Sequence, residues 1–201
     1  MGNVYDQIDE KLVAWIGQQH LFFVATAARA DHGHVNVSPK GPIGSLRILG
    51  PRRVAYLDLI GSGAETVAHL RENGRIVIML CAFAGPPRIV RLHGRGQVYQ
   101  IGEPGFAELN AELDFTGIAA AHDASRAIIV IDVDRISDSC GYGVPLMAYQ
   151  GERPQLMAWI DRKLQKSDDA LMEYVAEQNA TSIDGLPAFE PMILPRHEIR
   201  K

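Results

Sequence analysis

The sequence predicts a mainly β protein with peripheral helices, arranged as an antiparallel barrel or sandwich. Six runs rich in Val, Ile and aromatic residues precede residue 138, and Gly and Pro residues punctuate them. The connections between runs are short, and the third and fourth runs are separated by one helix-sized insert, Ser62–Arg71. Parallel strands need long crossover connections, so this spacing favours antiparallel pairing.

The expected elements follow one another in a simple order. A helix is predicted over Asp6–Gly17, where apolar residues at helical spacing end at a glycine. The strand-like runs are HLFFVATAA, VNVS, RVAYLDL, RIVIMLCAF, RIVRLHGRGQVY and AIIVIDVDRI. Further helices are predicted over Ser62–Arg71, Pro104–Leu113 and Pro154–Gln178. The proline-rich tail from Ser182 is either a packed extended arm or partly disordered.

The composition is that of one ordinary globular domain with an appended element. The chain has 201 residues, 47% of them hydrophobic, and a net charge of −4. We expect neither a signal peptide nor a membrane span, because charged residues interrupt the first apolar run and no apolar run reaches about 20 residues. Cys81 and Cys140 form neither a metal pattern nor a disulfide framework. A cytoplasmic protein without a metal site is therefore expected.

Positive charge is concentrated in the centre of the chain. Residues 40–95 contain nine Lys or Arg against three acidic residues, whereas the whole chain is acidic. A basic centre inside an acidic protein suits a small anionic ligand better than a nucleic acid. The alternative is that these cations are solvated or pair with the acidic C-terminal third.

Two predicted strands carry a row of hydrogen-bonding groups on one face. In HVNVSPKGP, which spans residues 34–42, Val35 and Val37 alternate with the polar residues His34, Asn36, Ser38 and Lys40. In residues 88–99 one face carries Arg91, His93, Arg95 and Gln97, and the other carries Val90, Leu92 and Val98. Gly94 and Gly96 lie on the apolar face, which permits a bulge or a close backbone approach. Either polar face is a candidate binding surface or simply meets water.

The segment LIGSGAET predicts the start of a helix. Ser62 and Glu65 have the spacing of a capping box, in which Ser62 accepts the Glu65 amide and Glu65 returns a hydrogen bond. The flanking Gly61 and Gly63 leave amides available, and such a helix start can hold a phosphate. An ordinary capped helix explains the pattern equally well, and no Gly-Lys-Ser/Thr of a Walker loop follows.

Classical hydrolase and metalloenzyme chemistry is not supported. His32 and His34 lack a third ligand at useful spacing. Cys140 has no partnered base and is interpreted as a small buried thiol. Ser38 lacks a nucleophile-elbow sequence. No residue is assigned a catalytic role.

Residues 5–138 resemble the pyridoxamine 5′-phosphate oxidase-like family of FMN-binding split-barrel proteins. The resemblance rests on the order of FFVATA, HVNVSPKG, RVAYLDLIGSGAETVAHLRENGRIVIMLCAF and RIVRLHGRGQVY after an N-terminal helix. It implies a six-stranded antiparallel Greek-key split β-barrel and a homodimer with flavin sites at the interface. Residues 1–150 would form the FMN-binding domain, and residues 151–201 a C-terminal helix and extended tail packed on the barrel.

The resemblance also implies a cofactor site. The residues it assigns to FMN are Asn36, Ser38, Lys40, Asp58, Ser62, Glu65, Thr66, and Arg91 or Arg95. Lys40 would lie near the isoalloxazine or the phosphate, and Arg91 or Arg95 would supply further phosphate charge. The vitamin B6 oxidases carry Ser-Arg-Lys where this chain reads Ala64-Glu65-Thr66, which disfavours pyridoxamine phosphate oxidation.

The function that the resemblance implies is that of an FMN-binding oxidoreductase acting on a small organic substrate. Two alternatives stay open. One is a non-catalytic flavin- or haem-binding carrier or sensor, since a fold does not fix a function. The other is a reductase that uses a 5-deazaflavin coenzyme, whose acidic tail would suit the many arginines.

Overall fold

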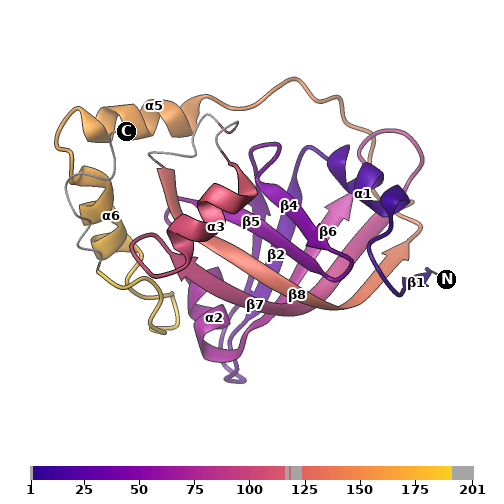
Figure 1. The fold of residues 1–201 in the computed structure, drawn as a ribbon, viewed down its shortest axis with the longest axis horizontal. Coiled ribbons are helices and arrows are strands. Elements are labelled where there is room, and N and C mark those ends of the chain that lie inside the picture. The colour runs from indigo at the N-terminus through magenta and orange to yellow at the C-terminus, as the bar shows by residue number, and fades with distance from the viewer. Residues whose placement is uncertain (1, 116–117, 119–123, 192–201) are drawn as a thin grey trace.

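One curved antiparallel sheet forms the centre of the molecule in the computed structural model, which describes residues 2–115, 118 and 124–191 (Figure 1). Its spatial order is β3-β2-β6-β7-β8-β5-β4, and β1 pairs with β8. The strands are β1 Val4–Tyr5, β2 Phe22–Ala27, β3 Val35–Lys40, β4 Leu46–Gly50, β5 Arg53–Leu59, β6 Arg75–Cys81, β7 Ile89–Gln100 and β8 Ser125–Ser139. The sheet does not close, because β3 and β4 end the order. The fold is the predicted mainly β split barrel.

The six predicted runs correspond to β2, β3, β5, β6, β7 and β8. The strand β4, five residues in the connection before β5, was not predicted. Its side chains are all partly exposed, so it lacks the alternation of buried and exposed residues that identifies a strand. The two-residue β1 is too short to give a pattern at all.

The described residues contain five helices. They are α1 Glu10–Gly17, α2 Glu65–Asn73, α3 Phe106–Leu113, α5 Gln155–Leu164 and α6 Ala170–Gln178. The expectation of one helix over residues 154–178 is wrong, because α5 and α6 are separate. Between them the Ser167 hydroxyl accepts the amide of Asp169, a local turn that competes with helical hydrogen bonding.

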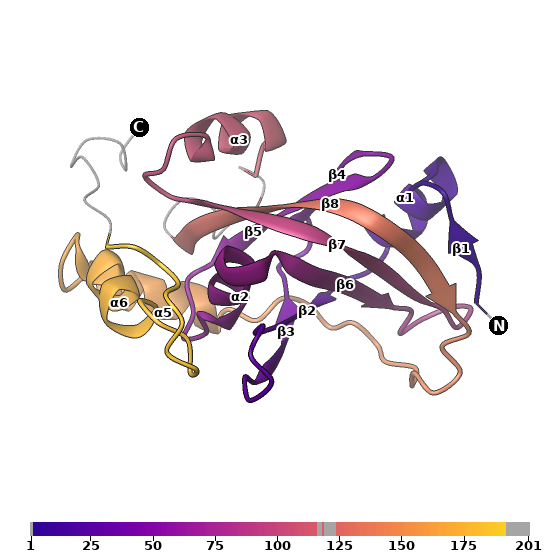
Figure 2. The ribbon, with the colours of Figure 1, turned by 90° about the horizontal axis from the view of Figure 1, so that it is seen from below.

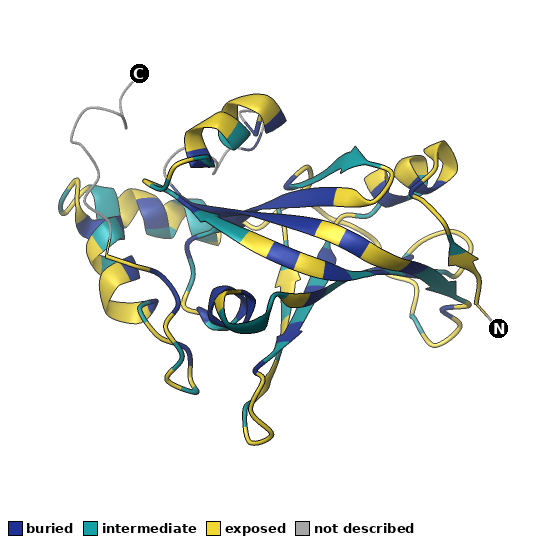
Figure 3. Cartoon of the chain, turned by 60° about the horizontal axis from the view of Figure 1, so that its bottom comes forward, coloured by how far each residue is buried: buried dark blue, intermediate teal, exposed yellow. Residues whose placement is uncertain are grey.

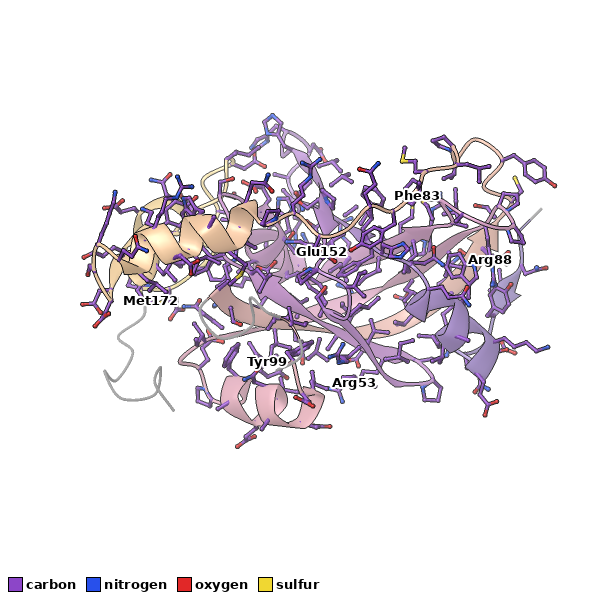
Figure 4. The ribbon with its side chains drawn as sticks, turned by 90° about the horizontal axis from the view of Figure 1, so that it is seen from above. Arg53, Phe83, Arg88, Tyr99, Glu152 and Met172 are labelled. Atoms are coloured by element: carbon purple, nitrogen blue, oxygen red, sulfur yellow. The ribbon has the colours of Figure 1, made fainter. Side chains whose placement is uncertain are left out.

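The helices cover the sheet on both faces. Figure 2 shows α2 and α3 on opposite sides of β7 and β8. The larger hydrophobic cluster fills the concave side of the sheet, where α2 packs, and a smaller one lies between β5, β8 and α3. Tyr99 packs against α3 in this smaller cluster (Figure 4). The middle of β5, residues 54–58, and the first part of β8, residues 125–131, are therefore buried on both faces.

The two glycines of β7 correspond to a bulge and to a close approach of a neighbouring element, as the sequence predicted. Gly94 lies at a bulge between β7 and β8, where an added Cβ would come within 2.1 Å of a backbone oxygen of β8. At Gly96 an added Cβ would meet Leu70 of α2 at 2.8 Å. Along most of β7, buried residues alternate with partly or fully exposed ones (Figure 3). Small residues thus let α2 and β8 approach the β7 backbone.

A segment without regular structure leads from β8 to α5 across one end of the barrel. Glu152 belongs to this segment, and Phe83, from the connection between β6 and β7, lies beside it (Figure 4). The carbonyl oxygen of Phe83 accepts the amide of Met147, and Glu152 accepts the amide of Ile43. Cys140, at the start of this segment, is exposed, so its expected burial is wrong. The reason is that β8 has already left the core at this point.

Residues on both sides of position 150 share one core. Ile160, Leu171, Val175 and Phe189 belong to the same buried cluster as the barrel strands. The division of the chain at residue 150 stays a prediction. Among the described residues, no helix is long and apolar enough to cross a membrane.

Candidate functional site

The strand pairings show which way the polar row of β3 points. Directly paired residues lie on the same face of a sheet. Ser38 pairs with Val24 of β2, and Val24 pairs in turn with the buried Ile78 of β6. Asn36, Ser38 and Lys40 therefore point to the concave, core-facing side, where their side chains are partly buried. The apolar face of β3 points outward, with Val35 71% and Val37 60% exposed.

The basic row of β7 lies on the opposite face. Arg91 pairs with Met79, Met79 pairs with Phe23, and Phe23 pairs with the exposed Pro39 of β3. The structure thus does not bring Arg91 and Arg95 together with Lys40 within one chain. Arg91 instead donates to the Ser139 hydroxyl at 3.1 Å, and Arg95 donates to a carbonyl oxygen at the end of α2 at 2.7 Å.

A chain of side-chain hydrogen bonds links β3 to α2. The Ser38 hydroxyl donates to the Asn36 carbonyl oxygen at 2.9 Å. The Asn36 amide donates to Thr26 at 3.2 Å and to Thr66 at 3.0 Å. Thr26 in turn lies 2.9 Å from Nδ1 of His69, which is fully buried. Three of the predicted site residues, Asn36, Ser38 and Thr66, therefore meet in one network.

A buried carboxylate between two cations lies beside this network. One oxygen of Asp58 on β5 accepts the Lys40 ammonium at 2.7 Å, and the other accepts Nε of Arg126 on β8 at 2.7 Å. Burial alone would raise the pKa of Asp58, but Arg126 and Lys40 outweigh it and leave the pKa below its ordinary value. The three groups together carry one positive charge.

Arg126 is a site residue that the sequence patterns did not reveal. Its side chain is 4% exposed, and it donates to the carbonyl oxygens of Gly61 and Gly63 and to the side chain of Asn179. The only signal in the sequence is a charged residue at the head of the apolar run of β8. The position of Asn179, near the end of α6, gave no signal because the contact spans 53 residues of sequence.

The start of α2 differs from the expected capping box. The helix begins at Glu65, and the residue at its N-cap, Ala64, has no capping side chain. Ser62 is exposed and lies outside the helix. The Glu65 carboxylate accepts the amides of Ala64 at 3.1 Å and Ile183 at 3.3 Å. The chain's own carboxylate thus already binds an amide at this helix start.

Three buried polar atoms have no hydrogen-bond partner among the described residues: the Tyr56 hydroxyl, Nε2 of His69 and the Ser45 hydroxyl. Burial, followed by the nearby Asp58, raises the pKa of Tyr56 well above its ordinary value, so the phenol stays protonated. The Lys40 ammonium lies 5.9 Å from the centre of the Tyr56 ring. The Tyr56 ring therefore lies beside Lys40, and His69 belongs to the hydrogen-bond network that starts at β3.

Ion pairs neutralise part of the basic centre of the chain. Among the described residues, carboxylates pair with the following four of its cations: Lys40, Arg53, Arg71 and Arg88. The expected pairing with the acidic C-terminal third accounts for two of them, Arg71 with Glu190 and Arg88 with Asp138. Arg53 pairs with Asp132 and Lys40 with Asp58, which both lie earlier in the chain. In the described part of the chain, no group of three His, Cys, Asp or Glu side chains is arranged to hold a metal ion.

Comparison with known proteins identifies the class. The family described as pyridoxamine 5′-phosphate oxidase matches residues 8–140. The chain belongs to this family, as its sequence resemblance predicted. The matched region ends before α5 and includes Lys40, Asp58 and Arg126, but not Asn179.

The chain is also similar to individual proteins. It is 35% identical over 207 residues to the pyridoxamine 5′-phosphate oxidase family protein ustO of Aspergillus flavus, covering 96% of this chain and 80% of that protein. Among solved structures, an FAD-binding protein from Mesorhizobium loti has a TM-score of 0.47 at 11% identity, covering 69% of this chain and 96% of that one. An FMN-binding protein from Syntrophomonas wolfei has a TM-score of 0.42 at 15% identity, covering 61% and 78%.

Proposed function

We propose that the chain binds FMN and acts as a flavin-dependent oxidoreductase on a small organic substrate. The proposal rests on membership of the pyridoxamine 5′-phosphate oxidase family and on one structural observation. That observation is the polar face of β3, which turns a lysine and two hydrogen-bonding side chains towards the concave side of the sheet. When bound, a flavin supplies the transfer of hydride or electrons, so no acid–base pair of the protein is required.

Lys40 is the proposed contact to the flavin ring. Its ammonium has three N–H donors, of which Asp58 takes one, and its side chain is 18% exposed. The remaining donors are suited to an electron-rich edge of a flavin, where a cation stabilises the anionic reduced form. Ser38 and Asn36 are proposed to orient the ring from the same strand.

The phosphate is proposed to lie towards α2, near Ser62 and Thr66. Glu65 opposes an anion there, because its carboxylate already accepts the amide of Ala64. Positive charge must therefore come from elsewhere. Arg91 and Arg95 lie on the outer face of the sheet, so they can serve a flavin only across a subunit interface.

A homodimer built on this outer face is part of the proposal. The exposed Val35 and Val37 continue through Ala25 and Val77 as an apolar band over three strands. Apolar patches of this kind commonly mark protein–protein contacts. Pairing of two such faces would bring the arginines of one subunit near the other.

The first test is the absorbance spectrum of the purified protein after incubation with FMN and gel filtration. Retained bands at about 370 and 450 nm, in proportion to protein, support the proposed cofactor. Lys40→Met is expected to weaken FMN binding, whereas Lys11→Met, an exposed lysine of α1, should not change it. A protein that retains no FMN would overturn the proposal, and a single band at about 420 nm on purification would indicate a 5-deazaflavin instead.

Activity is tested separately from binding. The FMN-loaded protein is mixed anaerobically with NADH or NADPH, and loss of the flavin absorbance at about 450 nm reports reduction. Reduction followed by reoxidation with a small organic acceptor supports the oxidoreductase. A loaded protein that no reductant bleaches would favour a flavin carrier or sensor.

A further inference from the structure

The C-terminal part of the chain, which lies outside the family match at residues 8–140, reaches the candidate site through Asn179. This side chain is fully buried. Its amide donates to the carbonyl oxygens of Gly61 at 2.9 Å and Ser62 at 3.1 Å. Its carbonyl oxygen accepts a hydrogen bond from Arg126 at 2.9 Å. One residue therefore uses both ends of its amide to bind the loop before α2 and the buried arginine.

Arg126 binds the loop before α2, the carboxylate of Asp58 and the side chain of Asn179 at the same time. Its guanidinium binds Asp58 at 2.7 Å, the carbonyl oxygens of Gly61 at 3.0 Å and Gly63 at 2.8 Å, and Asn179. The ring of Phe189, also C-terminal to the family match, lies 4.6 Å from the guanidinium carbon. A planar guanidinium with several directed donors fixes its partners more rigidly than a lysine would.

The same arginine determines where Lys40 lies. Asp58 is 1% exposed and uses one oxygen for Arg126 and the other for Lys40. A displacement of Arg126 therefore moves the Asp58 carboxylate. Among the described residues, this carboxylate is the only hydrogen-bond partner of the Lys40 ammonium. Asn179, Arg126, Asp58 and Lys40 form one continuous series of contacts from α6 to β3.

We propose that Arg126 is a positioning residue of the flavin site and that Asn179 couples the C-terminal segment, residues 170–190, to cofactor binding. This inference rests on the proposed function, because it assumes that Lys40 contacts the flavin. Coupling between two events is reciprocal. Binding of FMN therefore tightens the docking of residues 170–190, and loss of the Asn179 contact weakens FMN binding even though Asn179 touches no flavin.

The segment also offers a matched control. Asp184 holds it to the exposed His34 on the β2–β3 connection, with contacts of 2.6 Å to the ring and 2.8 Å to the backbone amide. This contact anchors the same segment but has no part in the series through Arg126. Asp184→Ala therefore removes a docking contact of residues 170–190 but none of the contacts in the series from Asn179 to Lys40.

The experiment compares wild type, Asn179→Ala, Phe189→Leu and Asp184→Ala. The dissociation constant for FMN is measured by flavin fluorescence, and amide hydrogen exchange over residues 170–190 is followed with and without FMN. In wild type, FMN should slow exchange in this segment. Asn179→Ala should weaken FMN binding by about tenfold and lose the FMN-dependent protection. Phe189→Leu should show both effects to a smaller extent, and Asp184→Ala neither.

The possible failures are distinguishable. If wild type binds no FMN, the proposed function is wrong. If wild type binds FMN while a folded Asn179→Ala binds it equally well and keeps the protection, the coupling is wrong. If Asn179→Ala does not fold, Phe189→Leu decides, because the Asn179 hydrogen bonds remain in that variant. Equal losses in Asp184→Ala and Asn179→Ala would assign the effect to docking in general and overturn the role of Arg126.

Discussion

Replacing Asp58 by asparagine should destabilise the protein strongly. The substitution Asp58→Asn keeps the shape of the side chain but removes the negative charge between Lys40 and Arg126, both 2.7 Å away. Arg126 is 4% exposed and cannot turn to water, whereas Lys40 is 18% exposed and can do so in part. Removing one partner of a buried ion pair costs about 3–5 kcal/mol. Because Lys40 can be hydrated and an amide oxygen still accepts one hydrogen bond, we expect about 3 kcal/mol.

Urea unfolding followed by circular dichroism measures this loss. The matched control is Asp132→Asn, because Asp132 lies 3.5 Å from Arg53 with the two side chains 66% and 51% exposed. An exposed pair contributes about 0–1 kcal/mol. The double variant Asp58→Asn with Arg126→Met should lose less stability than the sum of the two single variants, since the buried Arg126 charge is gone and only the partly exposed Lys40 charge lacks its partner. Equal effects of Asp58→Asn and Asp132→Asn would refute the assignment of a buried charge centre.

Three further predictions concern packing, titration and thiol chemistry. Gly94→Ala should cost about 1–3 kcal/mol in free energy of unfolding, because its Cβ would lie 2.1 Å from a backbone oxygen, while Gly50→Ala in β4, with no atom within 4 Å, should cost less in the same urea assay. Burial lowers the pKa of His69, so the unfolded chain binds its proton more readily, and stability should fall as pH drops below about 6.5. His69→Gln should make that fall shallower in urea titrations, and an unchanged slope would contradict it. A thiol reagent should modify the exposed Cys140 rapidly and Cys81 only on unfolding, since burial raises the pKa of the Cys81 thiol; mass spectrometry of Cys140→Ser, expected to remain unlabelled, checks this.

Local pattern predicted six of the eight strands and, for residues 34–40 and 88–99, the two faces of the strand. The alternation in residues 34–40 separated Val35 and Val37 from Asn36, Ser38 and Lys40, and the structure keeps that separation. Pattern alone does not say which face points to the core. In β3 the polar face points inward and the valines outward, the reverse of the usual arrangement, and only the pairing with β2 reveals it.

Long-range contacts account for what the sequence did not predict. Lys40 ends a strand of regular alternation, and the family resemblance made both Lys40 and Asp58 candidates. Arg126 and Asn179 were not candidates, since their partners lie 53 to 118 residues away along the chain. The capping box was predicted from spacing, but the loop before α2 is instead held by Arg126 and Asn179, so the helix starts later.

Within the described residues, β3 and β4 pair with a neighbouring strand on one side only, which has a consequence for the behaviour of the chain at high concentration. Unpaired edge strands are templates on which another chain can add a strand and so begin aggregation. On β3 the imide nitrogen of Pro39 has no hydrogen to offer an incoming strand, and β4 spans only five residues. Pro39 therefore limits the addition of a second chain to β3, and replacing it should increase aggregation during expression and storage.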